Sequence, residues 1–269
     1  MNVLEKFLVT FLIFVICTIS SFSQDFEVSP VSLRFTAEPG DSQSKNVTVT
    51  NHSNKKTTFS LTIKDFFYEA DGTERKLASN SIKRSCAEWL NINPSFLEIN
   101  PNESQDVTVT IMVPAGEYST RWTRIYVQAV KEQTTFDVDK SLSTGIAVHG
   151  AIAIEVNQSP ESNSNFKATI SNLAEKKSEG DSIRIFTAYV NNIGDKIIKS
   201  RVYLVVSNIQ TAEETKYDPV IVRVFPESSR IVELKLPPGL PPGRYALAAV
   251  LDYWQNANLE GTQIIIEIK

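Results

Sequence analysis

Few side chains in this 269-residue sequence have the types and spacing needed for chemistry. His52 and His149 each stand without a second histidine, a cysteine or a spaced carboxylate beside them, so neither predicts a metal site. Cys86 follows Lys83 and Arg84, cations that would lower the pKa of the thiol if they were close in space. Without a histidine partner, a structural thiol is favoured. Motifs such as GxSxG, HExxH or a phosphate-binding glycine loop are absent from the sequence, which therefore predicts no catalytic residue, metal or cofactor.

Binding chemistry has better candidates, beginning with a basic cluster formed by Arg75, Lys76, Lys83 and Arg84. Guanidinium and ammonium groups at such spacing suit a carboxylate or an anionic polymer. The alternative is a solvated loop, which is favoured because runs of charge usually lie on a solvated surface. Two further arginines extend the cluster if the fold brings them near: Arg121 and Arg124.

The composition excludes some partners. Lys and Arg number 27 against 31 Asp and Glu, and the resulting net charge of −4 does not indicate nucleic-acid binding. The three tryptophans, Trp89, Trp122 and Trp254, have the ring faces that a glycan platform needs. Each lies in a strand pattern, however, so packing in a core or on a sheet face is favoured.

A segment near the middle of the chain has the strongest pattern of all. Gly145–Val156 alternates large aliphatic residues with small or polar ones, which predicts a strand with one apolar face. That face is formed by Ile146, Val148, Ile152, Ile154 and Val156. It either completes the core of its own sheet or is a docking face for a partner strand, with Ile146, Val148, Ile152 and Ile154 as partner-binding residues. The core alternative is favoured, because exposed apolar edges pair readily with other chains.

The N-terminal segment has the features of a secretory signal peptide. An apolar run, Phe7–Ile19, precedes small residues at Ser21 and Ser23, and it is shorter than the ~20 residues of a spanning helix. We expect cleavage after Ser23, which makes the protein an exported one, located in the periplasm or at the cell surface. No later segment predicts a transmembrane span. Only Cys86 would remain, so no intramolecular disulfide is expected.

The positioning elements are predicted to be strands throughout. Val28–Thr50 and Trp89–Val113 share one pattern, an alternating strand, a proline-containing or polar turn and a second strand, which we interpret as one unit used twice within a sandwich. Pro30 interrupts the opening strand and belongs at an edge or at a switch between sheets. Asp71-Gly72 predicts a hairpin turn, and Lys76–Arg84 is expected to be irregular. The other strands expected before the central segment are Thr57–Tyr68 and Tyr118–Val130.

The second half repeats the architecture after a composition break at Asn157–Asn165, which is rich in Ser and Asn. Seven short strands are expected beyond it: Phe166–Ile170, Ser182–Val190, Ser200–Val206, Val220–Phe225, Arg230–Leu236, Arg244–Leu251 and Thr262–Ile268. The predicted fold is therefore all-β, two tandem immunoglobulin-like β-sandwiches after a cleaved signal peptide. The predicted limits are 1–23 for the signal peptide, 24–157 for the first sandwich, 158–165 for the linker and 166–269 for the second sandwich.

Two families of exported sandwich proteins resemble this sequence at Val28–Thr50 and Trp89–Tyr118. Pilus-assembly chaperones of the PapD type share the opening strand, the turn around Gly40, the VTVTN strand and the long alternating strand that ends the first domain. The first domain of WxL-interacting surface proteins is similar at Trp89–Pro114 and Gly116–Val127. The resemblance covers most of residues 26–157.

What the resemblance implies is an envelope protein without enzymatic activity. It would bind a partner polypeptide through a strand edge, as a chaperone-like or adaptor component of secretion or surface assembly. The alternative is a structural protein that binds peptidoglycan or a surface polysaccharide. The chaperones anchor a partner's terminal carboxylate with an Arg in the first strand and a Lys in the last strand of domain one. In this sequence Pro30 stands at the first of those positions, Arg34 lies nearby in another register, and Gly145–Val156 contains no Lys or Arg.

Overall fold

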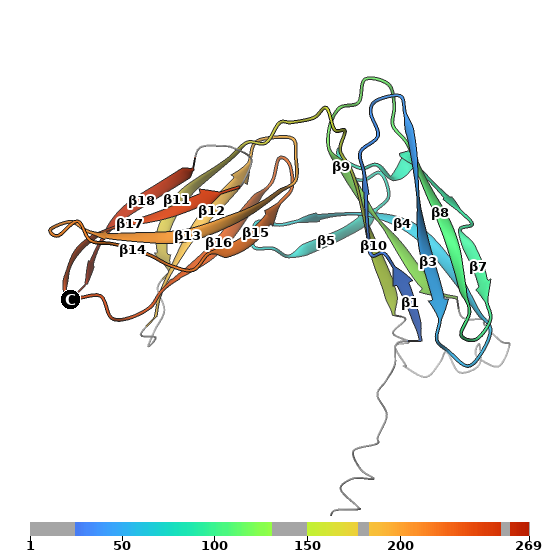
Figure 1. The fold of residues 1–269 in the computed structure, drawn as a ribbon, viewed down its shortest axis with the longest axis horizontal. Coiled ribbons are helices and arrows are strands. Elements are labelled where there is room, and N and C mark those ends of the chain that lie inside the picture. The colour runs from blue at the N-terminus through green and yellow to red at the C-terminus, as the bar shows by residue number, and fades with distance from the viewer. Residues whose placement is uncertain (1–24, 131–149, 177–182, 254–258, 269) are drawn as a thin grey trace, which may run out of the picture.

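The computed structural model describes residues 25–130, 150–176, 183–253 and 259–268. These residues form two β-sandwiches in tandem, and Figure 1 shows them set at an angle to each other. The only helical element in the described ranges is a 3-10 turn, η1 (Ala87–Trp89). The predicted all-β fold with two sandwiches is thereby confirmed.

The described residues of the N-terminal sandwich form ten strands, all of them short enough to be typical of such folds except the long hairpin strand β4. They are β1 (Phe26–Ser29), β2 (Ser32–Phe35), β3 (Ser42–Asn51), β4 (Thr57–Tyr68), β5 (Glu74–Ala78), β6 (Leu90–Asn93), β7 (Phe96–Ile99), β8 (Ser104–Met112), β9 (Arg121–Ala129) and β10 (Ala151–Gln158). One sheet has the order β1-β3-β8-β6, and the other has the order β2-β10-β9-β4-β5, with β7 also paired to β4.

Two proline-containing corners carry the chain from one sheet of this sandwich to the other. β1 pairs with β3 in the first sheet, while β2 pairs with β10 in the second, and the cis peptide bond Ser29-Pro30 lies between them. β6 and β7 repeat this arrangement around the cis bond Asn93-Pro94. The sheet switch predicted at Pro30 and the repeated unit are both confirmed.

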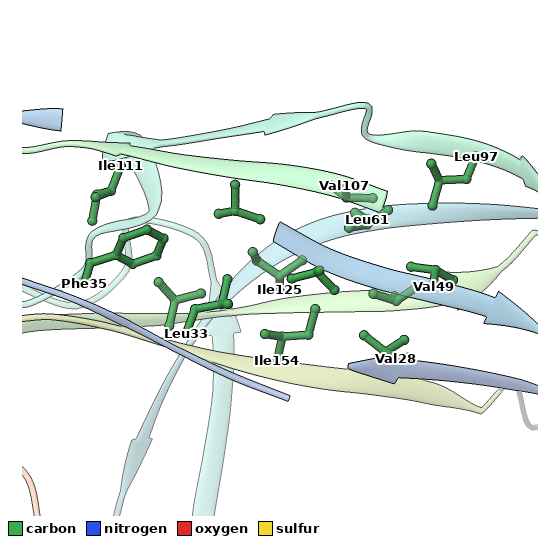
Figure 2. Close-up of a cluster of buried hydrophobic side chains, with 14 of the residues drawn as sticks. Val28, Leu33, Phe35, Val49, Leu61, Leu97, Val107, Ile111, Ile125 and Ile154 are labelled. Atoms are coloured by element: carbon green, nitrogen blue, oxygen red, sulfur yellow. The ribbon is translucent and has the colours of Figure 1, made fainter. Parts of the chain in front are cut away.

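The apolar faces of the two sheets meet in one core, which Figure 2 shows in close-up. Val47, Val107 and Ile125 are fully buried there, each on the inward side of an alternating strand. Ile154 of β10 lies in the same cluster and Ile152 packs against it. Each such side chain contributes about 1.5–3 kcal/mol by leaving water, so this core holds the sandwich without a disulfide.

The C-terminal sandwich has its own core and two further sheets. Its strands are β11 (Ala168–Lys176), β12 (Arg184–Asn192), β13 (Ile198–Asn208), β14 (Glu214–Lys216), β15 (Val220–Val224), β16 (Ser229–Leu236), β17 (Gly243–Asp252) and β18 (Glu260–Ile268). One sheet has the order β11-β12-β16, and the other has the order β14-β13-β17-β18, with β15 also paired to β13.

Three details differ from the sequence-based expectation. Lys76 belongs to β5 and is not irregular, because Glu74–Ala78 completes a hairpin with β4. β14 was not expected, since three polar residues give no alternation to detect. Asn157 and Gln158, assigned to the composition break, continue β10, because β2 pairs with it as far as Gln158. The domain limits themselves stay a prediction, and the signal peptide lies outside the described residues.

Candidate functional site

The edge of β10 is the first feature of the structure that could receive a partner. On one side β10 pairs with β9 along its whole length, from Ala151 to Gln158. On the other side β2 covers only Glu155–Gln158. The amide of Glu155 donates to the carbonyl of Val31, which shows that the odd-numbered residues of β10 direct their backbone groups toward this second side. Within the described ranges, Ala151 and Ala153 therefore present unpaired backbone groups at an open strand edge.

The apolar face of β10 points away from that opening. Ile154 is fully buried and Ile152 is partly buried against the N-terminal core, as the core alternative anticipates. The side chains of Ala151 and Ala153 lie on the outer face, where Ala151 is exposed. Ile146 and Val148 lie outside the described residues. A partner that uses the described part of β10 would thus contact its backbone and its small outer side chains. The role of the four predicted isoleucine and valine residues in binding stays a prediction.

The predicted basic cluster is distributed over separate places. Arg75 pairs with Glu69 across the β4–β5 hairpin, with Nε and Oε1 2.7 Å apart. Lys76, on the other face of β5, lies with its ammonium 5.4 Å from the ring centre of Tyr126. Lys83 is 85% exposed, and its ammonium lies 3.9 Å from the Glu227 carboxylate, which also binds Arg84. Arg75 and Lys76 contact other groups, so the four side chains divide between two places.

Arg84 lies between the two sandwiches. Its guanidinium pairs with Asp195 and, at 2.7 Å, with Glu227, both from the C-terminal sandwich. Burial lowers the pKa of Arg84, but the hydrogen bonds to Glu227 and Asp195 outweigh it and hold that pKa above its usual value. Asp195 also accepts hydrogen bonds from the Thr120 amide and the Asn163 side chain. Arg84 thus connects the two sandwiches, and Asp195 and Glu227 neutralise the charge of its guanidinium.

An aromatic cluster fills the rest of this joint. Phe225 of the C-terminal sandwich packs against Trp122 and Phe66 of the N-terminal one, with ring centres 4.8 and 5.6 Å apart. The Trp122 indole N–H donates to the Phe66 carbonyl at 3.0 Å. The turn of the β4–β5 hairpin, predicted at Asp71-Gly72, reaches β16, where the amide of Ile231 donates to the carbonyl of Ala70 (Figure 1). These contacts fix one sandwich against the other.

A cleft of about 600 Å³ opens at the joint, close to the C-terminal end of β10. Both sandwiches line it, through Arg34, Phe35, Thr36, Thr120, Asn157, Ser159, Phe166, Lys196, Ile197, Lys199, Ile221 and Arg223. Arg223 is held by Glu155 of β10, with Nη1 and Oε1 2.6 Å apart. Lys196 donates to Ser159 Oγ and the Pro160 carbonyl, and burial lowers its pKa. The lining is basic and partly aromatic.

Among the described residues, three of these cations have no ion pair, and of the three only Lys196 makes hydrogen bonds within the protein. Among the described residues, no ion pair engages Arg34 or Lys199, which come from different sandwiches. Arg34 is next to Asn157 in the β2–β10 register, so the two side chains lie on the same outer face. Sequence reasoning placed Pro30 at the anchor position and set Arg34 aside. The structure instead brings Arg34 to the cleft wall, because Pro30 ends β1 and a new strand register begins at Ser32.

The remaining candidates for chemistry are structural. Trp89 is buried under the guanidinium of Arg121, which lies 4.7 Å from its ring centre, and Trp122 belongs to the joint. The His52 imidazole contacts the Glu27 carboxylate, with Nε2 and Oε2 3.1 Å apart. In the part of the chain that the structure describes, no three His, Cys, Asp or Glu side chains gather as metal ligands, and no helix is long and apolar enough to span a membrane. His149 and Trp254 lie outside that part.

Cys86 is fully buried in the N-terminal core. Burial raises the pKa of its thiol, with the Asp65 carboxylate adding to the effect, in agreement with the structural thiol that the sequence favours. In a chain that begins at Gln24, we expect an aromatic disulfide reagent at pH 8 to modify the folded protein about a hundredfold or more slowly than the unfolded one. Absorbance of the released thiolate measures both rates, and equal rates would contradict the burial of Cys86.

Comparison with known proteins gives a likeness of fold. No protein-family model matches the chain, and no curated protein matches it in sequence. Among solved structures, a chain of the chaperone–tip adhesin complex of CFA/I fimbriae biogenesis matches with 13% identity and a TM-score of 0.50, over 90% of this chain and 98% of that one. The likeness shows that this chain has the same two-sandwich fold.

Two other solved structures are similar at lower TM-scores. The class 5 fimbriae chaperone CfaA matches with 15% identity and a TM-score of 0.46, over 89% of this chain and 98% of that one. A chain of the chaperone–tip subunit complex of Csu pili from Acinetobacter baumannii matches with 11% identity and a TM-score of 0.43, over 78% and 90% of the two chains. No comparison bears on the WxL-interacting proteins.

Proposed function

We propose that this protein is an exported, non-enzymatic chaperone-like or adaptor component that binds a partner polypeptide by strand addition at the open edge of β10. The observation that carries the proposal is the mismatch in length between β10 and its neighbour β2. Because the pairing of β2 with β10 begins only at Glu155, Ala151 and Ala153 have backbone groups toward this side that no other strand of the described ranges pairs. The fold is one that a chain of a chaperone–tip adhesin complex also has.

The cleft extends this proposal to the end of the partner strand. A strand that runs parallel to β10 along its open edge ends at Val31, where β2 takes over the pairing, and Arg34 lies further along β2 on the wall of the cleft. A carboxylate in a part of the partner that extends past Val31 would meet Arg34 and Lys199, which have no ion pair among the described residues. The alternative of an anionic polysaccharide depends on a single basic surface, and the four side chains Arg75, Lys76, Lys83 and Arg84 do not provide one.

A proline at Ala153 tests the edge directly. The amide of Ala153 faces the open side, so Ala153→Pro removes no hydrogen bond of the β9–β10 ladder but abolishes the donor that a partner strand needs. We expect the variant to fold and to lose its partner. The mature protein is purified from the envelope of its own organism together with whatever polypeptide it binds. A polypeptide that co-purifies with it in a 1:1 molar ratio should be absent from the Ala153→Pro preparation and present in that of the control Ala153→Val.

Hydrogen–deuterium exchange shows where the partner sits. In the complex, the amides of Ala151 and Ala153 should be protected by about a hundredfold or more relative to the free protein. Unchanged exchange at both amides in a stoichiometric complex would refute strand addition at this edge, even if the complex itself is genuine. A partner that stays bound to Ala153→Pro would refute it as well.

A further inference from the structure

One sheet of the C-terminal sandwich, β14-β13-β17-β18, has an outer face that is largely apolar (Figure 1). Its inner face belongs to the C-terminal core, which includes Leu204 of β13 and Leu247 of β17. Because side chains alternate along a strand, the neighbours of these residues point outward. The polar residues in the middle of the outer face are Ser207 and Gln263. The apolar ones are Tyr203, Val205, Ala246, Ala248, Val250 and Ile265.

Such a face is unusual on the solvent side of an antiparallel sheet, which commonly has one apolar and one polar face. The sheet β1-β3-β8-β6 of the N-terminal sandwich has the usual polar outer face, where the Thr48 hydroxyl donates to Asp106 across β3 and β8. On the C-terminal sheet, Ile265 is 61% exposed, and Ala246 and Ala248 are only half-buried. A contiguous apolar patch in contact with water marks an interaction site.

The shape of this face favours another flat sheet as its occupant. Its centre is formed by Ala246 and Ala248, whose methyl side chains allow a second sheet to approach to the ~10 Å at which sheets pack face to face. Four strands about 4.8 Å apart, each contributing about eight residues at about 3.3 Å, give an area on the order of 500 Å². Two such faces would bury about 1,000 Å² together, which is the size of a weak but specific interface.

The charges on β14 indicate that the second sheet belongs to another copy of this chain. The Lys216 ammonium lies 3.9 Å from the ring centre of Tyr203, and Glu214 accepts a hydrogen bond from Ser207, so both charges are on the outer face. In the part of the chain that the structure describes, neither has an ion pair. A two-fold axis that crosses the sheet midway between Lys216 and Glu214 would bring each of them opposite the other residue of the second copy.

We propose that this protein forms a weak symmetric dimer through the outer face of the β14-β13-β17-β18 sheet. Lys216 shares a row of the sheet with Ala248, and Glu214 shares the next row with Ala246. The axis that pairs the charges therefore also sets Ala248 of one copy over Ala246 of the other. The apolar centre supplies the affinity, and the two exposed ion pairs fix the orientation. The open edge of β10 takes no part in this interface, which goes beyond the proposed function.

Sedimentation equilibrium of the chain from Gln24 to Lys269 measures the association. In about 0.15 M salt we expect a dimer with a Kd of about 10–100 µM. Ala248→Arg places a long charged side chain at the centre of the face and should weaken the dimer at least about tenfold. Ile265→Lys is the second variant if the first unfolds. Thr187→Arg, at a half-buried outward position of β12 in the other sheet, is the matched control and should leave the Kd unchanged. Circular dichroism confirms that each variant is folded.

Two charge reversals test the symmetry of the dimer. Lys216→Glu sets two acidic pairs against each other in a homodimer, and Glu214→Lys sets two basic ones, so each variant alone should dimerise at least about fivefold more weakly. An equal mixture of the two variants should form a heterodimer with about the wild-type affinity, because every Glu then faces a Lys. If the mixture associates no better than the single variants, the two-fold arrangement is wrong.

The remaining outcomes decide between this face and other surfaces. Loss of the dimer in Ala248→Arg, with Thr187→Arg and Ala153→Pro unchanged, supports the proposal. A wild-type chain that stays monomeric at the highest concentration refutes it, as does a dimer that Ala248→Arg and Ile265→Lys both leave intact. A dimer that is lost in Ala153→Pro and kept in Ala248→Arg forms at the edge of β10 and refutes it as well. A monomeric chain whose 1:1 complex with a partner polypeptide is lost in Ala248→Arg would assign the face to that partner instead.

Discussion

Ile154→Asp is expected to unfold the N-terminal sandwich. Ile154 is fully buried between the two sheets, so the substitution removes about 1.5–3 kcal/mol of apolar burial and places a carboxylate where no donor can reach it. The unpaired charge adds a cost of several kcal/mol, and the sum approaches the stability of about 5–15 kcal/mol that a whole domain has. Urea unfolding followed by circular dichroism at the β-sheet signal measures the loss.

The matched control for this variant lies on the same strand. Ala151→Asp introduces the same charge at an exposed position of β10, and it should change the free energy of unfolding by less than about 0.5 kcal/mol. A cooperative transition for Ile154→Asp at the urea concentration of the wild type would mean that this face of β10 is not core. The docking-face interpretation of the alternating segment would then regain its support.

Phe225→Ala is expected to uncouple the two sandwiches. The ring is 5% exposed and packs on Trp122, Phe66 and Tyr68, so its removal leaves a cavity at the joint and costs about 3–5 kcal/mol. Each core is separate from this cluster, so both sandwiches should stay folded. Calorimetry should resolve two thermal transitions where the wild type has one. Small-angle X-ray scattering should show a larger radius of gyration and a broader distribution of interatomic distances than in the wild type.

Another phenylalanine provides the control. Phe96 is 67% exposed, and Phe96→Ala should leave the thermal transition and the scattering curve nearly unchanged. A single transition for Phe225→Ala, at the temperature of the wild type, would show that Arg84 and the β4–β5 hairpin hold the joint without the aromatic cluster.

The strands of this protein could be predicted because each buries one face. In β3 and β8, the residues Val47, Val49, Val107 and Val109 alternate with polar ones, and a period of two with β-branched residues has no helical interpretation. β14 could not be found in this way, since all three of its residues are exposed. β10 ends at Gln158, two residues beyond the expected end at Val156. Its last residues, Asn157 and Gln158, are polar, but β2 pairs with them and the Gln158 side chain donates to the Ala37 carbonyl.

The candidate site was harder to predict than the fold. The cleft combines Arg34 from the start of the chain, Asn157 from its middle and Lys199 from the second sandwich, and no local pattern connects such distant positions. The basic cluster was selected because its residues are close in sequence. The structure divides them between two places, since Arg75 and Lys76 lie on opposite faces of β5 while Lys83 and Arg84 both lie near Glu227. The signal that could have found Arg34 was the sheet switch at Pro30, which resets the register after it.

The contact between Ala70 and Ile231 covers part of an exposed sheet edge, which bears on aggregation. A sheet that ends in bare amides and carbonyls is a template on which unrelated chains can aggregate. The turn of the β4–β5 hairpin occupies one such margin, β16, and at another, β18, the Arg184 guanidinium donates to the carbonyl of Glu267. These two contacts make the margins at β16 and β18 less available for pairing with unrelated chains.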